Sequence, residues 1–148
     1  MQRALSPKTR RVVQAILYEV FAVAFVGPAL ALIFDKPAVT ALSLAVFLSV
    51  FALAWNYVFN SFFERWEAGQ SQRGRSVLRR IAHASGFEGG LVIMLVPVIA
   101  WWLDITVLEA FIADLGVLAF FFVYSFAFTW SFDRIVGLPA SAIGKNDV

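Results

Sequence analysis

The sequence predicts an all-α integral membrane protein, with four transmembrane helices arranged as two tandem parallel-repeat hairpins and with cytoplasmic N- and C-termini. Of its 148 residues, 61% are hydrophobic and 15% are charged, whereas a soluble domain carries about 45–50% and about 25%. Four apolar segments each reach the ~20 residues that a helix needs to cross a bilayer. The chain also repeats itself after 69 residues, so that Arg10 is matched by Arg79 and Pro28 by Pro97. A duplicated pair of membrane helices accounts for all three observations.

The two apolar segments of the first half form one hairpin. The first helix is predicted over residues 12–34, because an apolar run follows Arg10 and Arg11 and ends at Asp35. The second helix is predicted over residues 39–63, and only four residues separate the two. So short a link makes the two helices antiparallel neighbours.

The second half of the chain repeats this arrangement. Its first helix is predicted over residues 81–103, directly after Arg79 and Arg80. Its second helix is predicted over residues 107–132, again after a very short link. The predicted domains are the first transmembrane hairpin repeat, a cytoplasmic linker and the second transmembrane hairpin repeat, at 10–66, 67–78 and 79–135.

Lysine and arginine are concentrated on one side of the predicted bundle. Eleven of the twelve lie in the two tails or in the link between the hairpins, and only Lys36 falls on the opposite side. Because basic loops are retained in the cytoplasm, this asymmetry predicts cytoplasmic termini. Trp66 and Trp130 near this side, with Trp101 and Trp102 near the other, fit the aromatic belts of a membrane protein.

Two glutamates occupy the same place in the two repeats. Seven residues separate Glu19 and Glu88 from the preceding arginine pair, which places each carboxyl ~10 Å inside its helix. An ionisable group at that depth is expensive and usually functional. It can hold a proton or a cation but not easily both, so both residues are candidates for coupling cation transport to proton flow. The alternative is a protonated glutamate that only joins helices by a hydrogen bond.

Other polar side chains lie near the glutamates. Asn56 and Asn60 share a helix face because they are four residues apart. Asn56 is predicted at the depth of Glu19, where it would orient the carboxyl or contact a substrate, although interhelical packing explains it equally well. Asp114 lies nearer the outer side than Glu88, and would either assist coupling there or pack at the interface.

Aromatic residues are the third component of the predicted site. Tyr18, Trp55 and Tyr57 lie close in depth to Glu19. An acid surrounded by aromatic faces suits an organic cation, because ring faces attract positive charge. We therefore predict these three residues and the two asparagines as substrate-binding residues.

Small residues on the third helix predict a close helix contact. Gly86 and Gly90 are four apart, a spacing that lets two membrane helices approach closely. The partner helix could belong to the same chain or to a second copy. Since four helices enclose little volume, we also predict a homodimer.

Several residue types receive a structural interpretation. Asp35 and Asp104 are predicted as turn and cap residues. His83, the single histidine, is predicted to form a hydrogen bond near the inner surface. Pro28 and Pro97 are predicted to kink their helices.

The sequence gives no support for an enzyme, a cofactor, a metal site or a nucleic-acid partner. It contains no cysteine, which excludes disulfides and thiolate metal sites. It has no hydrolase triad, phosphate-binding loop or HExxH pattern. The small excess of basic residues follows membrane orientation. The predicted partners are therefore protons, organic cations and the lipid bilayer.

The combination of these motifs resembles one known family of membrane proteins. The shared features are Tyr18-Glu19, Gly86-Phe87-Glu88-Gly89-Gly90, Trp55-Asn56 with Asn60 and Phe63-Glu64, and the Ala-Asp-Leu-Gly stretch at 113–116. They resemble the proteobacterial antimicrobial compound efflux family, which is built from two bacterial transmembrane pair domains. One departure lies in the first repeat, where Gln14, Leu17 and Val20 replace the family's usual histidine and two glycines.

The resemblance implies a proton-coupled exporter of cationic biocides in the bacterial inner membrane. Chlorhexidine and acriflavine are the implied substrates, with short diamines as native ones. It places the family's essential membrane acid on Glu19, its second-helix asparagine on Asn56 and its fourth-helix acid on Asp114. Two alternatives remain: a non-transporting assembly or sensory module whose acids are structural, and an exporter of the small-multidrug-resistance type. The repeat and the long charged link argue against the latter.

Overall fold

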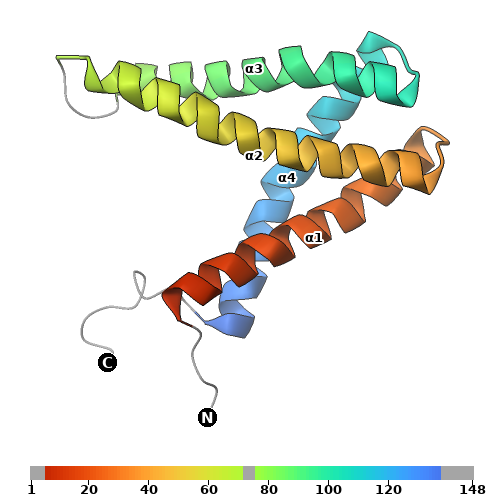
Figure 1. Cartoon of the computed structure of the whole chain (residues 1–148), viewed down its shortest axis with the longest axis horizontal. Helices are drawn as coiled ribbons and strands as arrows, with labels where there is room; N and C mark the ends of the chain where they lie inside the picture. Colours follow the sequence, from red (N-terminus) through yellow and green to blue (C-terminus); the bar gives the residue numbers. More distant parts are fainter. Residues whose placement is uncertain (1–5, 72–75, 138–148) are drawn as a thin grey trace.

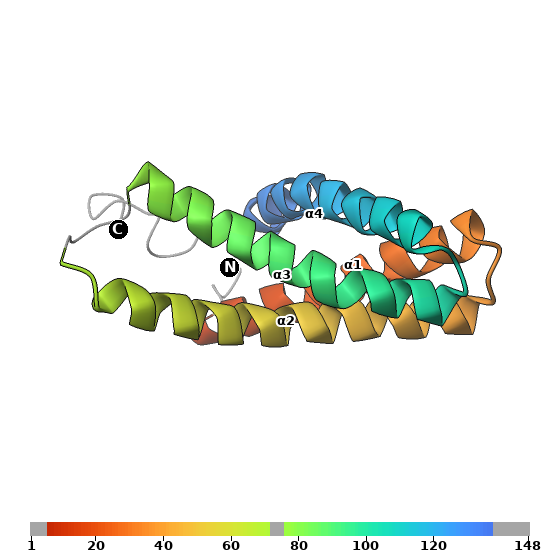
Figure 2. The ribbon, with the colours of Figure 1, turned by 90° about the horizontal axis from the view of Figure 1, so that it is seen from above.

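The computed structural model describes residues 6–71 and 76–137. Four helices make up this part of the chain: α1 (Pro7–Ile33), α2 (Ala38–Ala68), α3 (Val77–Leu103) and α4 (Val107–Val136). Each is long and apolar enough to cross a membrane. The α1–α2 and α3–α4 turns lie at one end of the bundle, here the turn end, and the opposite end is here the terminal end (Figures 1 and 2). The structure confirms the predicted four-helix fold class.

Three of the four helices extend beyond the predicted spans at the terminal end. The expected spans followed only apolar residues, whereas each helix continues into its polar flank. Ser6 and Ser76 cap α1 and α3, with their hydroxyls accepting from the backbone N–H groups of Thr9 and Arg79. Such caps satisfy amide groups that a helix start leaves unpaired. α2 runs on to Ala68, so the link between the hairpins is shorter than its charge pattern indicated.

Both hairpin turns have the same backbone geometry. Asp35 and Asp104 take left-handed conformations with φ of 49° and 51°, which aspartate tolerates better than most residues. The N–H of Lys36 donates to the carbonyl of Ala31, and that of Ile105 donates to Ala100, both at 3.0 Å. These bonds close the helix ends in the manner of a Schellman motif. The prediction of turn residues at Asp35 and Asp104 is confirmed.

The apolar core lies in the half of the bundle nearest the turns. Leu44, Ile99 and Leu103 are its fully buried large side chains. They belong to α2 and α3, whereas α4 contributes only Ala110 among the buried members of this cluster. Pro28 and Pro97 lie inside α1 and α3, and the helical assignment continues through both.

The two repeats meet along two seams, α2–α3 and α1–α4, which the repeat makes equivalent. In the first seam Trp55 Nε1 donates to the carbonyl of Phe87 at 3.1 Å. In the second, Tyr124 Oη donates to the carbonyl of Tyr18 at 2.8 Å. Trp55 and Tyr124 are repeat counterparts, as are Phe87 and Tyr18. The same hydrogen bond therefore joins the hairpins twice, each time beside one of the two glutamates.

The α2–α3 seam is much more closely packed than the α1–α4 seam. A Cβ on Gly90 would lie 2.3 Å from Cζ2 of Trp55, and a Cβ on Gly86 would lie 3.1 Å from Cζ of Phe59. The glycine pair of α3 thus receives two aromatic rings of α2. The predicted close contact is found, and its partner lies in the same chain.

The α1–α4 seam is joined at the terminal end by polar contacts. Arg10 forms a salt bridge with Asp133 and donates from Nη2 to the carbonyl of Gly137 at 3.0 Å. Its guanidinium also stands 5.1 Å from the centre of the Phe132 ring. We call this group the α1–α4 latch.

The charge asymmetry places the basic residues of the described helices mainly at the terminal end. Lys8, Arg10, Arg65, Arg80 and Arg134 flank helix ends there, whereas Lys36 lies at a hairpin turn. Four further basic positions and one linker glycine lie outside the described residues, namely Arg3, Arg73, Arg75, Lys145 and Gly74. The cytoplasmic location of this end stays a prediction.

Candidate functional site

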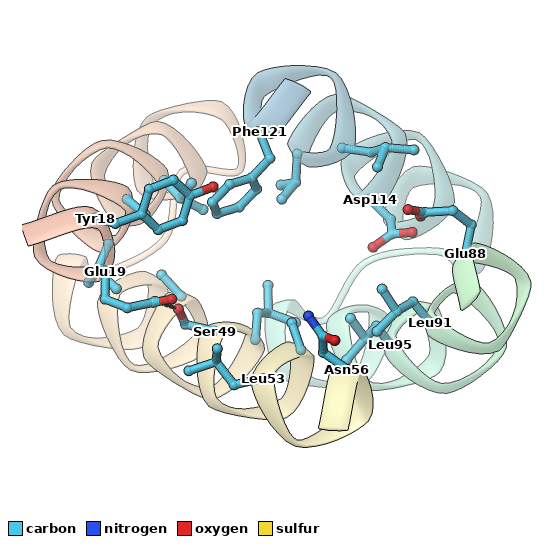
Figure 3. A pocket seen from close by; sticks show the side chains of 18 of the residues that line it. Tyr18, Glu19, Ser49, Leu53, Asn56, Glu88, Leu91, Leu95, Asp114 and Phe121 are labelled. Atoms are coloured by element: carbon cyan, nitrogen blue, oxygen red, sulfur yellow. Dashed lines mark hydrogen bonds between the residues drawn. The ribbon is translucent and has the colours of Figure 1, made fainter. Parts of the chain in front are cut away.

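A cavity of about 320 Å³ lies between all four helices. Figure 3 looks into it and shows side chains from α1, α2, α3 and α4 pointing inward. Val26, Leu48 and Leu95 line it and also belong to the buried core, so the cavity borders the core. The polar residues that line it are Tyr18, Glu19, Ser49, Asn56, Glu88 and Asp114.

Glu19 is held by a serine of the neighbouring helix. Ser49 Oγ donates a hydrogen bond to Glu19 Oε2. Asn56, the partner expected from depth, lines the same cavity but forms no hydrogen bond with Glu19 among the described residues. Glu19 lies 14 residues before Ile33 at the shared turn, whereas Ser49 lies 11 and Asn56 18 residues beyond Ala38. Glu19 therefore sits between the two levels and bonds toward the turn end.

Glu88 and Asp114 meet on the opposite side of the cavity. Their carboxyl groups point toward one another in Figure 3, and the charge of Glu88 acts on Asp114. The sequence placed Asp114 nearer the outer side than Glu88. In the structure the α3–α4 hairpin brings the two acids to one place.

The two asparagines have different surroundings. Asn56 lines the cavity, and its backbone carbonyl accepts from Asn60 Nδ2 at 2.9 Å. Asn60 lies outside the cavity lining, where Oδ1 is 2.8 Å from Nε2 of His83 on α3. His83 is packed edge-on against Phe59 and Phe63. His83 and Asn60 thus form a polar link across the α2–α3 seam.

The three aromatic candidates also separate. Tyr18 lines the cavity, and its hydroxyl shares a hydrogen bond of 2.7 Å with Ser125. Trp55 packs on Gly90 in the α2–α3 seam and is not among the lining residues. Tyr57 points outward and is 77% exposed. Phe121, which sequence reasoning did not single out, lines the cavity beside Tyr18.

The cavity is suited to positive charge. Its lining contains three carboxyl groups and, within the described part of the chain, no lysine, arginine or histidine. The rest of the lining is largely apolar. Carboxylates in such surroundings need a proton, a cation or a strong hydrogen bond, because desolvation of an unpaired charge is costly. The arrangement can exchange protons for an organic cation.

Comparison with protein families gives two consecutive matches to one family, described as chlorhexidine efflux transporter, over residues 6–69 and 75–138. The chain belongs to this efflux transporter family. Each match covers one helical hairpin, so the family unit is the repeat. A transporter, and not an enzyme, is what the family description indicates.

Three relatives of the efflux family carry the description short-chain diamines transporter. The protein of Acinetobacter baumannii is 41% identical over 126 residues, 85% of this chain and 87% of the relative. That of Vibrio parahaemolyticus is 38% identical over 128 residues, 86% of this chain and 91% of the relative. That of Acinetobacter baylyi is 37% identical over 126 residues, with 85% and 89% covered. No solved structure matches the chain.

Family membership confirms the resemblance drawn from the sequence motifs. It also supports a transporter over a non-transporting module. Within this efflux transporter, sequence reasoning missed Ser49. The available signal was its distance from the hairpin turn, which is close to that of Glu19.

Proposed function

We propose that the chain is a proton-coupled exporter of cationic, partly hydrophobic compounds in the bacterial inner membrane. The observation that carries the proposal is the acidic, otherwise apolar cavity enclosed by all four helices. Glu19, Glu88 and Asp114 supply the negative charge. The family description supports export of such compounds.

The acids form two negative poles. Glu19 with Ser49 lies on one side of the cavity, and Glu88 with Asp114 lies on the other (Figure 3). A dication with its charges at two ends matches this arrangement. The relatives' description as short-chain diamines transporters fits that chemistry, and we extend the substrates to chlorhexidine and acriflavine.

Coupling follows from competition for the same carboxyl groups. Two facing carboxylates in apolar surroundings repel, so Glu88 and Asp114 hold either a proton or a cation between them. Cation binding then releases protons, and protons arriving from the other side of the membrane release the cation. Glu19 alternates in the same way while Ser49 fixes its orientation.

The apolar part of the substrate lies against aromatic and aliphatic walls. Tyr18 and Phe121 present neighbouring rings, with centroids 6.2 Å apart, and ring faces attract organic cations. Asn56 offers an amide at the edge of the cavity. Trp55 and Asn60 support the site from the α2–α3 seam, and Tyr57 lies outside it.

A homodimer with cytoplasmic termini completes the proposal. The cavity forms within one chain, so a second copy is not needed to enclose it. The exposed outer face of α4 is the largest helix surface left for such a contact, since its most apolar stretch has no buried residue. Cross-linking in native membranes tests this arrangement.

The decisive experiment is transport driven by a pH gradient in proteoliposomes, with putrescine, chlorhexidine and acriflavine as probes. Glu19→Gln should abolish transport, because the amide cannot exchange a proton. Glu88→Gln should reduce it strongly, as the facing pair loses one charge. Glu64→Gln, at an exposed position of α2 near the terminal end, serves as the matched control and should transport like the wild type. Wild-type rates in Glu19→Gln would refute the coupling role.

A further inference from the structure

A second hollow lies between α1 and α4 in the turn half of the bundle. It is an open groove of about 630 Å³, lined by these two helices alone. Its walls are apolar except for Glu109, the one charged side chain in its lining among the described residues. The groove faces the surroundings of the bundle, which in a membrane are lipid chains.

The groove adjoins the central cavity. Val26 of α1 and Val117 of α4 line both hollows. These two side chains are therefore the partition between the groove and the carboxyl groups inside.

The repeat explains why the groove exists on this seam only. The repeat counterparts of Ile33 and Gly116 are Trp102 and Phe47. In the α2–α3 seam these two rings pack with centroids 5.4 Å apart. The groove is the space that the same aromatic pair would occupy between α1 and α4.

The partition is also thinner than its counterpart. Val26 and Val117 correspond to Leu95 and Leu48 in the α2–α3 seam. Both leucines belong to the buried core. Each position has thus lost a methylene on the α1–α4 side, which leaves less side-chain volume to be moved aside.

Polar contacts hold the α1–α4 seam in its other half. Among the described residues, the hydrogen bonds and the salt bridge between α1 and α4 involve Arg10 and Tyr18 on α1. Both lie on the terminal side of the groove. In the turn half the two helices meet through apolar side chains such as Phe25 and Phe120, with ring centroids 6.3 Å apart. This half can separate without breaking a hydrogen bond between the helices.

We propose that the groove is a lateral binding site for amphipathic organic cations, from which they pass between Val26 and Val117 into the central cavity. The apolar body of the cation lies in the groove and its charge pairs with Glu109 at the edge. The occupant follows from the continuity with an acidic cavity and from the single acid in an apolar lining. A short diamine is too hydrophilic to enter hydrocarbon, so it reaches the cavity from water. This inference rests on the proposed export function.

Filling the groove tests the route. The double variant Ile33→Trp/Gly116→Phe places the aromatic pair of the other seam into the groove, and a Cβ at Gly116 meets no atom within 4 Å. Leu32→Trp adds bulk at a neighbouring side chain that is 84% exposed and serves as the control. In proteoliposomes, the double variant should lower acriflavine transport at least about fivefold and leave putrescine transport within about twofold. Unchanged acriflavine transport, or equal loss of both substrates, would overturn the proposal.

A labelling measurement separates this proposal from the proposed function. Because the chain has no cysteine, a single Gly116→Cys can be labelled with a bilayer-soluble maleimide. Chlorhexidine or acriflavine should slow its labelling at least about threefold, with no effect on Phe122→Cys, which faces outward on the same helix. Equal labelling with and without these cations refutes the groove site even if transport is intact. Failure of the wild type to move any cation refutes the export function, while protection at Gly116→Cys would still support the groove as a site.

Discussion

Glu19 and Glu88 hold equivalent positions in the repeat, yet single neighbouring residues make their surroundings different. Ser49 donates to Glu19, whereas the repeat counterpart of Ser49 is Leu118. Glu88 instead faces Asp114. A duplicated acid has thus become one hydroxyl-bound carboxyl and one carboxyl pair.

Replacing Ser49 by alanine tests the first of these environments. The change removes the hydroxyl that donates to Glu19 and leaves the helix intact. A hydrogen bond to a charged group contributes about 1.5–3 kcal/mol, so cation binding should weaken by about tenfold or more. The apparent KM for putrescine in proteoliposomes measures this effect. Ser49→Thr keeps the hydroxyl and should restore most of the affinity, and an unchanged KM in Ser49→Ala would contradict the role.

The acids could be predicted from the sequence, but their partners could not. A carboxyl in an apolar run is conspicuous, and Glu19, Glu88 and Asp114 all line the cavity. Trp55 and Tyr57 lie at the expected depth but face α3 and the outside. Depth follows from counting residues, whereas the direction in which a side chain points depends on which helix packs beside it.

At the level of elements, the two seams differ because one carries glycine and the other does not. Gly86 and Gly90 admit Trp55 and Phe59 into α3. Their repeat counterparts on α1 are Leu17 and Phe21, whose bulk keeps α4 farther away. The pattern of small residues therefore decides which pair of helices is tightly joined and which keeps a groove.

Two adjacent glycines of α3 provide a matched test of this packing. A Cβ at Gly90 would lie 2.3 Å from Trp55, whereas a Cβ at Gly89 meets no atom within 4 Å. Gly90→Ala should lower stability by about 1–3 kcal/mol through overpacking. Gly89→Ala gains the same helix propensity without the clash and should be neutral or stabilising. Thermal unfolding in detergent compares them, and equal melting temperatures would refute the close contact.

The helices themselves were largely predictable from the sequence. Apolar runs located all four, and the ends at the hairpin turns agree with the prediction to within one residue. The ends at the terminal side were placed too early, because hydropathy does not register the polar caps at Ser6 and Ser76. Local capping, rather than burial, sets these boundaries.

At the scale of the whole molecule, apolar packing and polar contacts occupy different halves of the bundle. The buried core lies toward the turns, and the α1–α4 latch lies at the terminal end. The repeat predicted two hairpins, and the two equivalent hydrogen bonds from Trp55 and Tyr124 show how they are joined. The sequence alone did not predict that the hairpins enclose a cavity, because hydropathy does not encode how helices are arranged around an axis.

The α1–α4 latch should determine how firmly the second seam is closed. The side chains of Arg10 and Asp133 are only 11% and 25% exposed, so their pairing is weakened little by solvent, and leaving one charge unpaired is costly. Asp133→Ala should therefore lower stability in detergent by about 1–3 kcal/mol, with Arg10→Ala lowering it more because the guanidinium also binds Gly137 and covers Phe132. A double-mutant cycle on thermal unfolding measures the coupling, and Arg11→Ala, an exposed neighbour, is the control. If the two single losses simply add, the salt bridge does not join the hairpins, and the seam is held by Tyr18 and its partners alone.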